Sequence, residues 1–143
     1  MLAYRAFFRA TSGWLEPGGR LALETIAHDQ APDTASPLGR GPLGDHVLQI
    51  FPESLCPQLC EVLVALEPWF ELEVLRSDAA DFGRTCREWA LALRAAREPA
   101  TAIVGAETVR RFEQYLVSSQ AQFRTGLITN YRFVLRRRDR PRA

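Results

Sequence analysis

The sequence predicts an α/β fold, on three observations. Segments whose apolar residues have helical spacing alternate along the chain with short segments in which apolar and polar residues alternate. Pro17, Gly18 and Gly19 form a turn signal directly before an apolar strand, because proline presets φ and glycine accepts positive φ. Glu24 stands near the carboxyl end of that strand, where open α/β sheets bind ligands. We therefore expect the chain to be organised around the strand 20–26.

The first elements are a helix, this strand and a long loop. A helix is predicted over 2–14, and its buried face is expected to carry Leu2, Ala6, Phe7, Ala10 and Trp14. Leu21 and Leu23 are expected on one buried face of the strand. The stretch 27–46 is rich in proline and glycine, which favours a lid or binding loop because structureless stretches of that length are uncommon in compact domains. His28 begins this loop and, as a lone histidine, is interpreted as structural.

The second half alternates in the same way. We expect a helix opened by Pro57 that ends before Pro68, and then a strand 70–75. The stretch 77–83, which contains Phe82, is expected to be a connection. Helices 85–97 and 107–125 and a strand 131–136 follow. The inward residues of the last two helices are expected to be Cys86, Trp89, Ala90, Leu93 and Ala96, then Val109, Phe112, Leu116, Ser119 and Phe123. Gly126 is placed to cap the longer helix.

Length and composition indicate one domain of 143 residues with a substantial core, since 47% of the residues are hydrophobic. No apolar stretch approaches the ~20 residues of a membrane span, and the charged, amphipathic start differs from a signal peptide. We therefore expect a cytoplasmic protein. The cysteines, Cys56, Cys60 and Cys86, are odd in number and lack a histidine cluster, so buried thiols are predicted and no metal site.

Charge is concentrated at the end of the chain. The last 12 residues hold six arginines and Asp139, which gives +5, while the other residues sum to −4 and the whole chain to +1. This segment is either a solvated tail or a patch for anionic membrane lipids or an acidic carrier protein. No nucleic-acid partner is expected. The arginines are Arg132, Arg136, Arg137, Arg138, Arg140 and Arg142.

General motifs do not name a reaction. The chain has no internal repeat, no GxGxxG, no P-loop and too few histidines for a plausible Ser-His-Asp arrangement. Four longer runs are more specific, and together they span nearly the whole chain. They are Leu15-Glu16-Pro17-Gly18-Gly19-Arg20-Leu21, Ile50-Phe51-Pro52, Asp81-Phe82-Gly83-Arg84-Thr85, and Tyr115-Leu116 with Phe123-Arg124-Thr125-Gly126.

These runs resemble the C-terminal half of cyclopropane-fatty-acyl-phospholipid synthases and mycolic acid cyclopropane synthases. The resemblance implies a class I S-adenosylmethionine-dependent methyltransferase fold, a Rossmann-like sheet of seven strands whose last strand runs antiparallel between the fifth and sixth. Three strands with flanking helices would lie in this chain, near Arg20, Phe70 and Tyr131. The first four strands, and with them nearly the whole S-adenosylmethionine site, would lie outside it, so no cofactor-binding residue is assigned here.

The resemblance also implies site residues. In the family, bicarbonate acts as a base and is held by a histidine, a backbone amide two residues later and a tyrosine, which would correspond here to Glu24, Ile26 and Phe82. Glu24 would repel bicarbonate, and Phe82 lacks the hydroxyl group. Either the Glu24 carboxylate, partly buried beside Phe82, replaces the anion as the base, or the site is lost in a non-catalytic homologue. The residues expected to bind substrate are Tyr115, which lines the acyl channel in the family, and Phe51, Ser119 and Phe123.

The expected function follows from this resemblance. It is methyl or methylene transfer from S-adenosylmethionine to an unsaturated acyl lipid or a similar apolar substrate, incomplete as a single chain. A fifth strand without its neighbour exposes a free edge, which favours a partner chain or a homodimer. The alternatives are a non-catalytic interaction subunit that completes its sheet on another chain, and a degenerate fragment.

Overall fold

The computed structural model describes residues 2–28, 49–52 and 56–141, and these form two compact units. The first unit comprises residues 1–29, 57–78 and 129–143, and the second comprises 30–56 and 79–128. Most of the predicted 27–46 loop therefore lies outside the described residues. The first unit holds α1 (Leu2–Trp14), β1 (Arg20–Ala27), α3 (Leu59–Leu66), β2 (Phe70–Ser77) and β3 (Thr129–Arg137).

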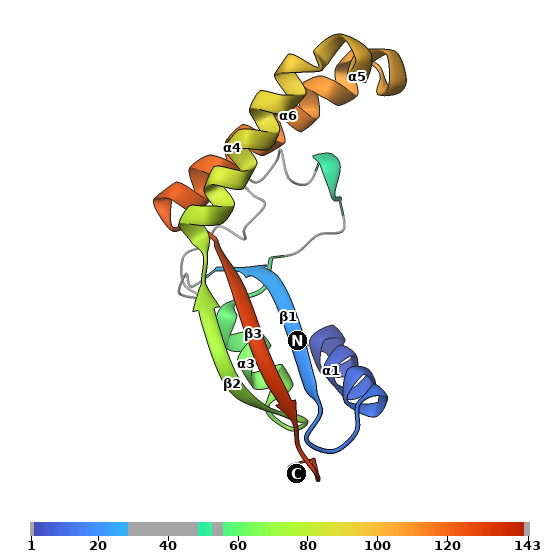
Figure 1. Ribbon diagram of the computed structural model, residues 1–143, viewed down its shortest axis with the longest axis vertical. Helices are drawn as coiled ribbons and strands as arrows, with labels where there is room; N and C mark the ends of the chain where they lie inside the picture. Colours follow the sequence, from blue (N-terminus) through green and yellow to red (C-terminus); the bar gives the residue numbers. More distant parts are fainter. Residues whose placement is uncertain (1, 29–48, 53–55, 142–143) are drawn as a thin grey trace. The chain divides into compact units, whose positions relative to one another are not determined.

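The three strands of the first unit form one sheet in the order β1-β3-β2 (Figure 1). β3 is antiparallel to both neighbours, so β1 and β2 run parallel to each other on either side of it. The register places Leu23 opposite Phe133 and Glu24 opposite Arg132. This arrangement confirms the prediction that the last strand lies antiparallel between the other two.

The core of this unit lies between the sheet and the helices α1 and α3. β3 supplies Tyr131, Phe133 and Leu135 to it, and Leu21 and Leu23 of β1 pack against it, as predicted. α3 begins two residues after Pro57, and the Glu61 carboxylate accepts a hydrogen bond from the backbone N–H of Gln58 at its start. The other buried members of the core are Phe8, Ala27, Val62, Ala65, Leu66 and Phe70.

The helix α1 has the predicted bounds but buries a different face. Phe8 is fully buried, whereas Ala6, Phe7, Ala10 and Trp14 are exposed, Phe7 at 41% and Trp14 at 78%. The buried face includes two hydroxyl side chains, which an apolar pattern does not detect. Thr11 and Ser12 are buried because their hydroxyls donate to helix carbonyls one turn earlier, Thr11 to Phe8 at 3.2 Å and Ser12 to Arg9 at 2.8 Å. The side chain of Leu2 lies outside the described residues.

The edge strand β2 is more exposed than its alternation predicts. Phe70 is buried, but Leu72, Val74 and Leu75 are exposed. The register pairs Leu72 with Leu135 and Leu75 with Phe133, so both lie on the core face of this edge strand and are nevertheless exposed; a bulge between Leu72 and Val74 places Val74 opposite Val134, on the outer face. The strand itself is confirmed.

The second unit holds three helices, α4 (Ala79–Ala95), α5 (Arg97–Val104) and α6 (Ala106–Thr125). The predicted helix 85–97 begins earlier, at Ala79, so Phe82 lies on α4 and not in a connection. α5 was not predicted. Its Pro99 lies in the first turn of the helix, where backbone N–H groups have no carbonyl partner within the helix. The N–H that proline lacks is therefore not needed at this position. Gly126 adopts φ +73° and caps α6 as predicted.

α4 packs against α6, and Gly83 explains their close approach. A Cβ at this position would lie 3.3 Å from the Cβ of Phe123. Cys86 and Ala90 of α4 and Val109, Leu116, Ser119 and Phe123 of α6 are buried as predicted. Trp89 and Phe112, also predicted to face inward, are exposed.

The thiols differ from one another. Cys86 is buried, and burial raises its pKa; burial also raises the pKa of Cys56 to about 12. Cys60 is exposed, so the prediction of buried thiols is wrong for this residue. Within the described ranges, no group of His, Cys, Asp and Glu side chains could hold a metal ion, and no helix has the length and apolarity to cross a membrane.

Candidate functional site

Glu24 lies on the face of the sheet opposite the core and forms an ion pair there. Its Oε2 is 3.0 Å from Nε of Arg132, the residue directly across the β1–β3 ladder. The Glu24 side chain is 48% exposed. The sequence placed Arg132 only among the terminal arginines, because the strand register alone brings it next to Glu24.

A second carboxylate holds the same arginine. Oδ2 of Asp78, just beyond the end of β2, is 3.1 Å from Nε of Arg132, and its Oδ1 accepts a hydrogen bond from Nη2 of Arg76 at 3.2 Å. The Asp78 side chain is only 6% exposed. A buried carboxylate is costly unless it is paired, so Asp78 and the two arginines stabilise one another. The result is a chain of charges that runs across all three strands.

Two further polar groups lie at this end of β1. Asn130 is 1% exposed, and its Nδ2 has no hydrogen-bond partner among the described residues. It pairs with Ile26 in the ladder and lies two residues before Arg132, on the same face of β3. His28 joins β1 to α3 through its backbone, whose N–H donates to Pro57 at 3.0 Å and whose carbonyl accepts from Leu59 at 3.1 Å. These bonds are consistent with the structural role predicted for His28.

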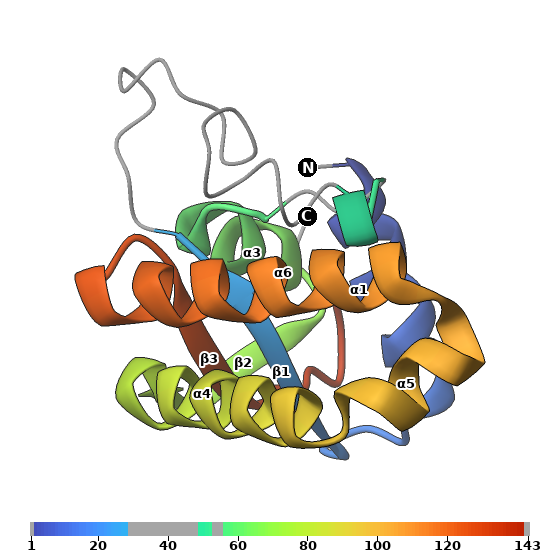
Figure 2. The same ribbon diagram turned by 90° about the horizontal axis from the view of Figure 1, so that it is seen from above.

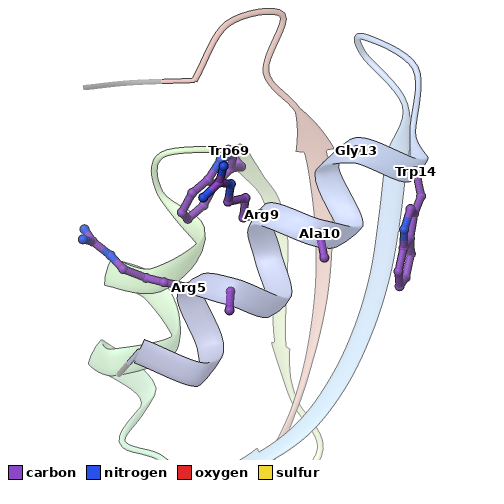
Figure 3. A pocket seen from close by; sticks show the side chains of 7 residues that line it. Arg5, Arg9, Ala10, Gly13, Trp14 and Trp69 are labelled. Carbon is purple, nitrogen blue, oxygen red and sulfur yellow. The ribbon is translucent and has the colours of Figure 1, made fainter.

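Glu24 also lines a hollow between β1 and α1. The hollow measures about 370 Å³ and is largely apolar, with Tyr4, Phe7 and Leu23 among its walls. Leu23, Glu24 and Thr25 of β1 line this hollow, while the Glu24 carboxylate pairs with Arg132 on the opposite face of the sheet. An apolar hollow of this kind suits an apolar ligand. A larger hollow of about 610 Å³ lies along the exposed side of α1, where Figure 3 shows Arg9 and Trp69 on one side and Trp14 on the other. The small residues that line this larger hollow, Ala6, Ala10 and Gly13, have no reactive side-chain group.

The other predicted site residues gather in the second unit, around α4 and α6. The rings of Phe82 and Phe123 have centroids 5.1 Å apart, and those of Phe51 and Tyr115 are 5.5 Å apart. Burial raises the pKa of Tyr115, and a hydrogen bond with Ser119 opposes this shift. Trp89 and Phe112, which sequence reasoning did not assign to the site, extend these aromatic contacts to Phe82 and Tyr115.

The four predicted substrate-binding residues differ in their exposure to solvent. Ser119 and Phe123 are buried in the packing of α6, which accounts for them as core residues. Phe51 is exposed and Tyr115 is half-buried, so these two present surface to a ligand. Glu24 and Ile26 belong to the first unit, whereas Phe51, Phe82 and Tyr115 belong to the second.

Most of the terminal arginines do not form a free tail. Arg132 and Arg136 lie within β3, and Arg136 pairs with Glu71. Arg137 donates to the carbonyl of Leu15 at 2.7 Å, and Arg138 pairs with Glu71 at 2.9 Å. The interpretation as a solvated tail is therefore wrong for these four residues. Because they are paired, they leave less unmatched positive charge for an anionic surface than the composition indicates.

Comparison with known proteins decides the family. A family model described as mycolic acid cyclopropane synthetase matches residues 1–133. The chain belongs to this family. The comparison with curated proteins gives no match.

Solved structures agree with this family assignment. The cyclopropane synthase MmaA2 from Mycobacterium tuberculosis is 28% identical with a TM-score of 0.82, over 93% of this chain and 49% of that one. The mycolic acid cyclopropane synthase CmaA1, solved in complex with SAH and CTAB, is 24% identical with a TM-score of 0.81, over 93% and 49%. A putative sarcosine dimethylglycine methyltransferase from Galdieria sulphuraria shares the fold at 13% identity, with a TM-score of 0.78, over 95% and 48%.

The mycolic acid cyclopropane synthetase family member described here therefore has the fold of the C-terminal half of a class I S-adenosylmethionine-dependent methyltransferase. The chain spans about half the length of these solved structures.

Proposed function

We propose that this chain is one half of an S-adenosylmethionine-dependent methyltransferase that acts on an unsaturated acyl chain or a similar apolar substrate. The family match over residues 1–133 is the observation that carries the proposal. The sheet order β1-β3-β2, with its reversed last strand, supports it. The fold alone does not give the reaction, so residues must account for the chemistry.

In the complete enzyme, the methyl group would pass from the sulfur of S-adenosylmethionine to an alkene carbon, which would leave S-adenosylhomocysteine and a carbocation at the neighbouring carbon. Glu24 would then accept a proton from the added methyl carbon, and the electron pair of the broken C–H bond would close the three-membered ring. A carboxylate held in place by an arginine can accept this proton without a free anion. Phe51 and Tyr115 would contact the acyl chain.

The open edge of β1 supports a requirement for a second half. No described strand pairs with the edge of β1 opposite to β3, and α1 lies alongside that edge (Figure 1). A helix that leads into such a strand is the second part of a β-α-β unit, whose right-handed crossover places a preceding parallel strand beside β1. The exposed apolar residues of α1, such as Phe7 and Trp14, would then be covered by that half.

The test is binding of S-adenosylmethionine by isothermal titration calorimetry. We expect no saturable binding by the 143-residue chain at millimolar ligand, because the nucleoside site would lie in strands outside it. The same chain joined to the N-terminal half of MmaA2, called the assembled enzyme below, is expected to bind with one-to-one stoichiometry. Stoichiometric binding by the chain alone would show that the cofactor site is misplaced.

A second candidate is a non-catalytic interaction subunit, which the same open edge favours. The assembled enzyme separates the two. Transfer of radiolabelled methyl groups to vesicles of dioleoyl phospholipid supports the methyltransferase. Cofactor binding without transfer of label to those vesicles or to a bacterial lipid extract supports the interaction subunit.

A further inference from the structure

Arg132 is shared by two carboxylates that differ in burial. Its Nε lies 3.0 Å from Glu24 and 3.1 Å from Asp78. Asp78 is nearly fully buried and is also bonded to Arg76, while Glu24 is half exposed. Asp78 is therefore held in place by burial and by its hydrogen bond from Arg76, and it contacts Arg132 through an ion pair, since its Oδ2 accepts no hydrogen bond among the described residues. Glu24 is the carboxylate that can leave.

The charges around Arg132 balance only when Glu24 is present. Asp78 and Glu24 together carry −2, and Arg76 and Arg132 carry +2. Without Glu24, the remaining side chains Asp78, Arg76 and Arg132 would carry a net positive charge. The Arg132 guanidinium would still be paired with the buried carboxylate of Asp78. The buried amide Nδ2 of Asn130, without a partner among the described residues, is a further donor on the same face of β3. An arginine fixed in this way is suited to bind a planar carboxylate.

We propose that Arg132, paired with Asp78, forms a carboxylate-binding site on the outer face of the sheet, and that Glu24 is its tethered occupant. Arg132 is then a positioning residue, which holds the Glu24 carboxylate on this face. The catalytic meaning of this site rests on the proposed function, but its binding chemistry does not. Removal of the Glu24 side chain should open the site to a small free carboxylate, for which formate is the probe.

The experiment uses the 143-residue chain and needs neither S-adenosylmethionine nor the second half. Thermal melts of Glu24→Ala are compared in sodium formate and in sodium chloride at equal ionic strength. We expect formate to raise the Tm of Glu24→Ala by ~3 °C over chloride, since a ligand that binds the folded state stabilises it. The wild-type chain and Glu24→Ala/Arg132→Gln should show no such difference.

A matched control separates a built site from any unpaired arginine. Arg20 forms an exposed pair with Glu73 on the same sheet, with a distance of 2.7 Å between Nε and Oε2. Among its described partners, Arg20 has no buried carboxylate that would hold its guanidinium in place. The Tm of Glu73→Ala should therefore be the same in formate and in chloride. An equal response of Glu73→Ala would overturn the proposal.

The NMR signal of the Arg132 Nε–H gives a direct readout. In Glu24→Ala this signal should shift saturably during a formate titration, and it should not shift in the wild-type chain. Glu24→Ser, which also removes the carboxylate and leaves room for formate, is the alternative variant if Glu24→Ala does not fold. The absence of any formate-dependent shift in a folded Glu24 variant refutes the site, whatever the assembled enzyme does with S-adenosylmethionine.

Discussion

Replacement of Glu24 by glutamine is expected to slow methyl transfer by the assembled enzyme ~10²–10⁴-fold, the usual cost of losing a general base. Glutamine keeps the shape of the side chain, but its amide cannot accept the proton. The measurement is the initial rate of radiolabel transfer from S-adenosylmethionine to dioleoyl phospholipid, at saturating cofactor. The loss should appear in kcat, because the cofactor site would lie in the other half.

The control for this experiment is Glu73→Gln. Glu73 is also a carboxylate on a strand of this sheet and also pairs with an arginine, Arg20, but it does not line the hollow next to α1. Its replacement should leave the rate unchanged. If Glu24→Gln retains full activity as well, Glu24 is a surface carboxylate paired with Arg132, and another group must take the proton.

The second large effect concerns the core. Phe8→Ala is expected to lower the free energy of unfolding by about 3–5 kcal/mol, because Phe8 is fully buried and the cavity would be only partly refilled. Its ring packs edge-on against Phe70, with a centroid distance of 6.0 Å. Phe7→Ala is the matched control, since Phe7 is the preceding residue and is 41% exposed; it should cost less than about 1 kcal/mol.

Urea unfolding of the two variants, followed by circular dichroism, checks this prediction. It decides which face of α1 is packed in solution. A larger loss for Phe7→Ala than for Phe8→Ala would mean that α1 turns the other face to the sheet, the face that the apolar spacing predicts.

The strands could be predicted from the sequence because their signals are local. The alternation of Leu21 and Leu23, and the apolar run that includes Phe133 and Leu135, mark residues that pack on one side of a sheet. Gly126 likewise marks the end of α6, since its positive φ suits a left-handed cap. In each case the residues that carry the signal lie inside the element or directly beside it.

The errors arose where tertiary contacts override a local signal. The packed face of α1 includes Thr11, whose hydroxyl is satisfied by its own helix, so polarity misleads there. Gly83 suggests a connection but lies inside α4, where its missing Cβ allows a close approach to Phe123. The start of α4 was missed for this reason, and Phe82 was placed in a loop.

The candidate site, like the fold, could be predicted from the sequence only in part. Glu24 could be selected from the sequence because it stands near the carboxyl end of a strand that follows a Pro-Gly-Gly turn, and because it matches a family position. Arg132 and Asp78 could not, since they lie on β3 and beyond β2 and meet Glu24 only through the strand register. Pairing across a sheet depends on register, and a shift of one residue turns each side chain to the other face.

The central claim is that a tethered carboxylate, Glu24, takes the place of an exchangeable bicarbonate base. The most direct measurement is the rate of methyl transfer by the assembled enzyme in buffer freed of carbon dioxide, before and after the addition of bicarbonate. The account predicts the same rate in both conditions, together with loss of activity in Glu24→Gln. A rate that rises severalfold with bicarbonate in the wild-type enzyme would contradict it.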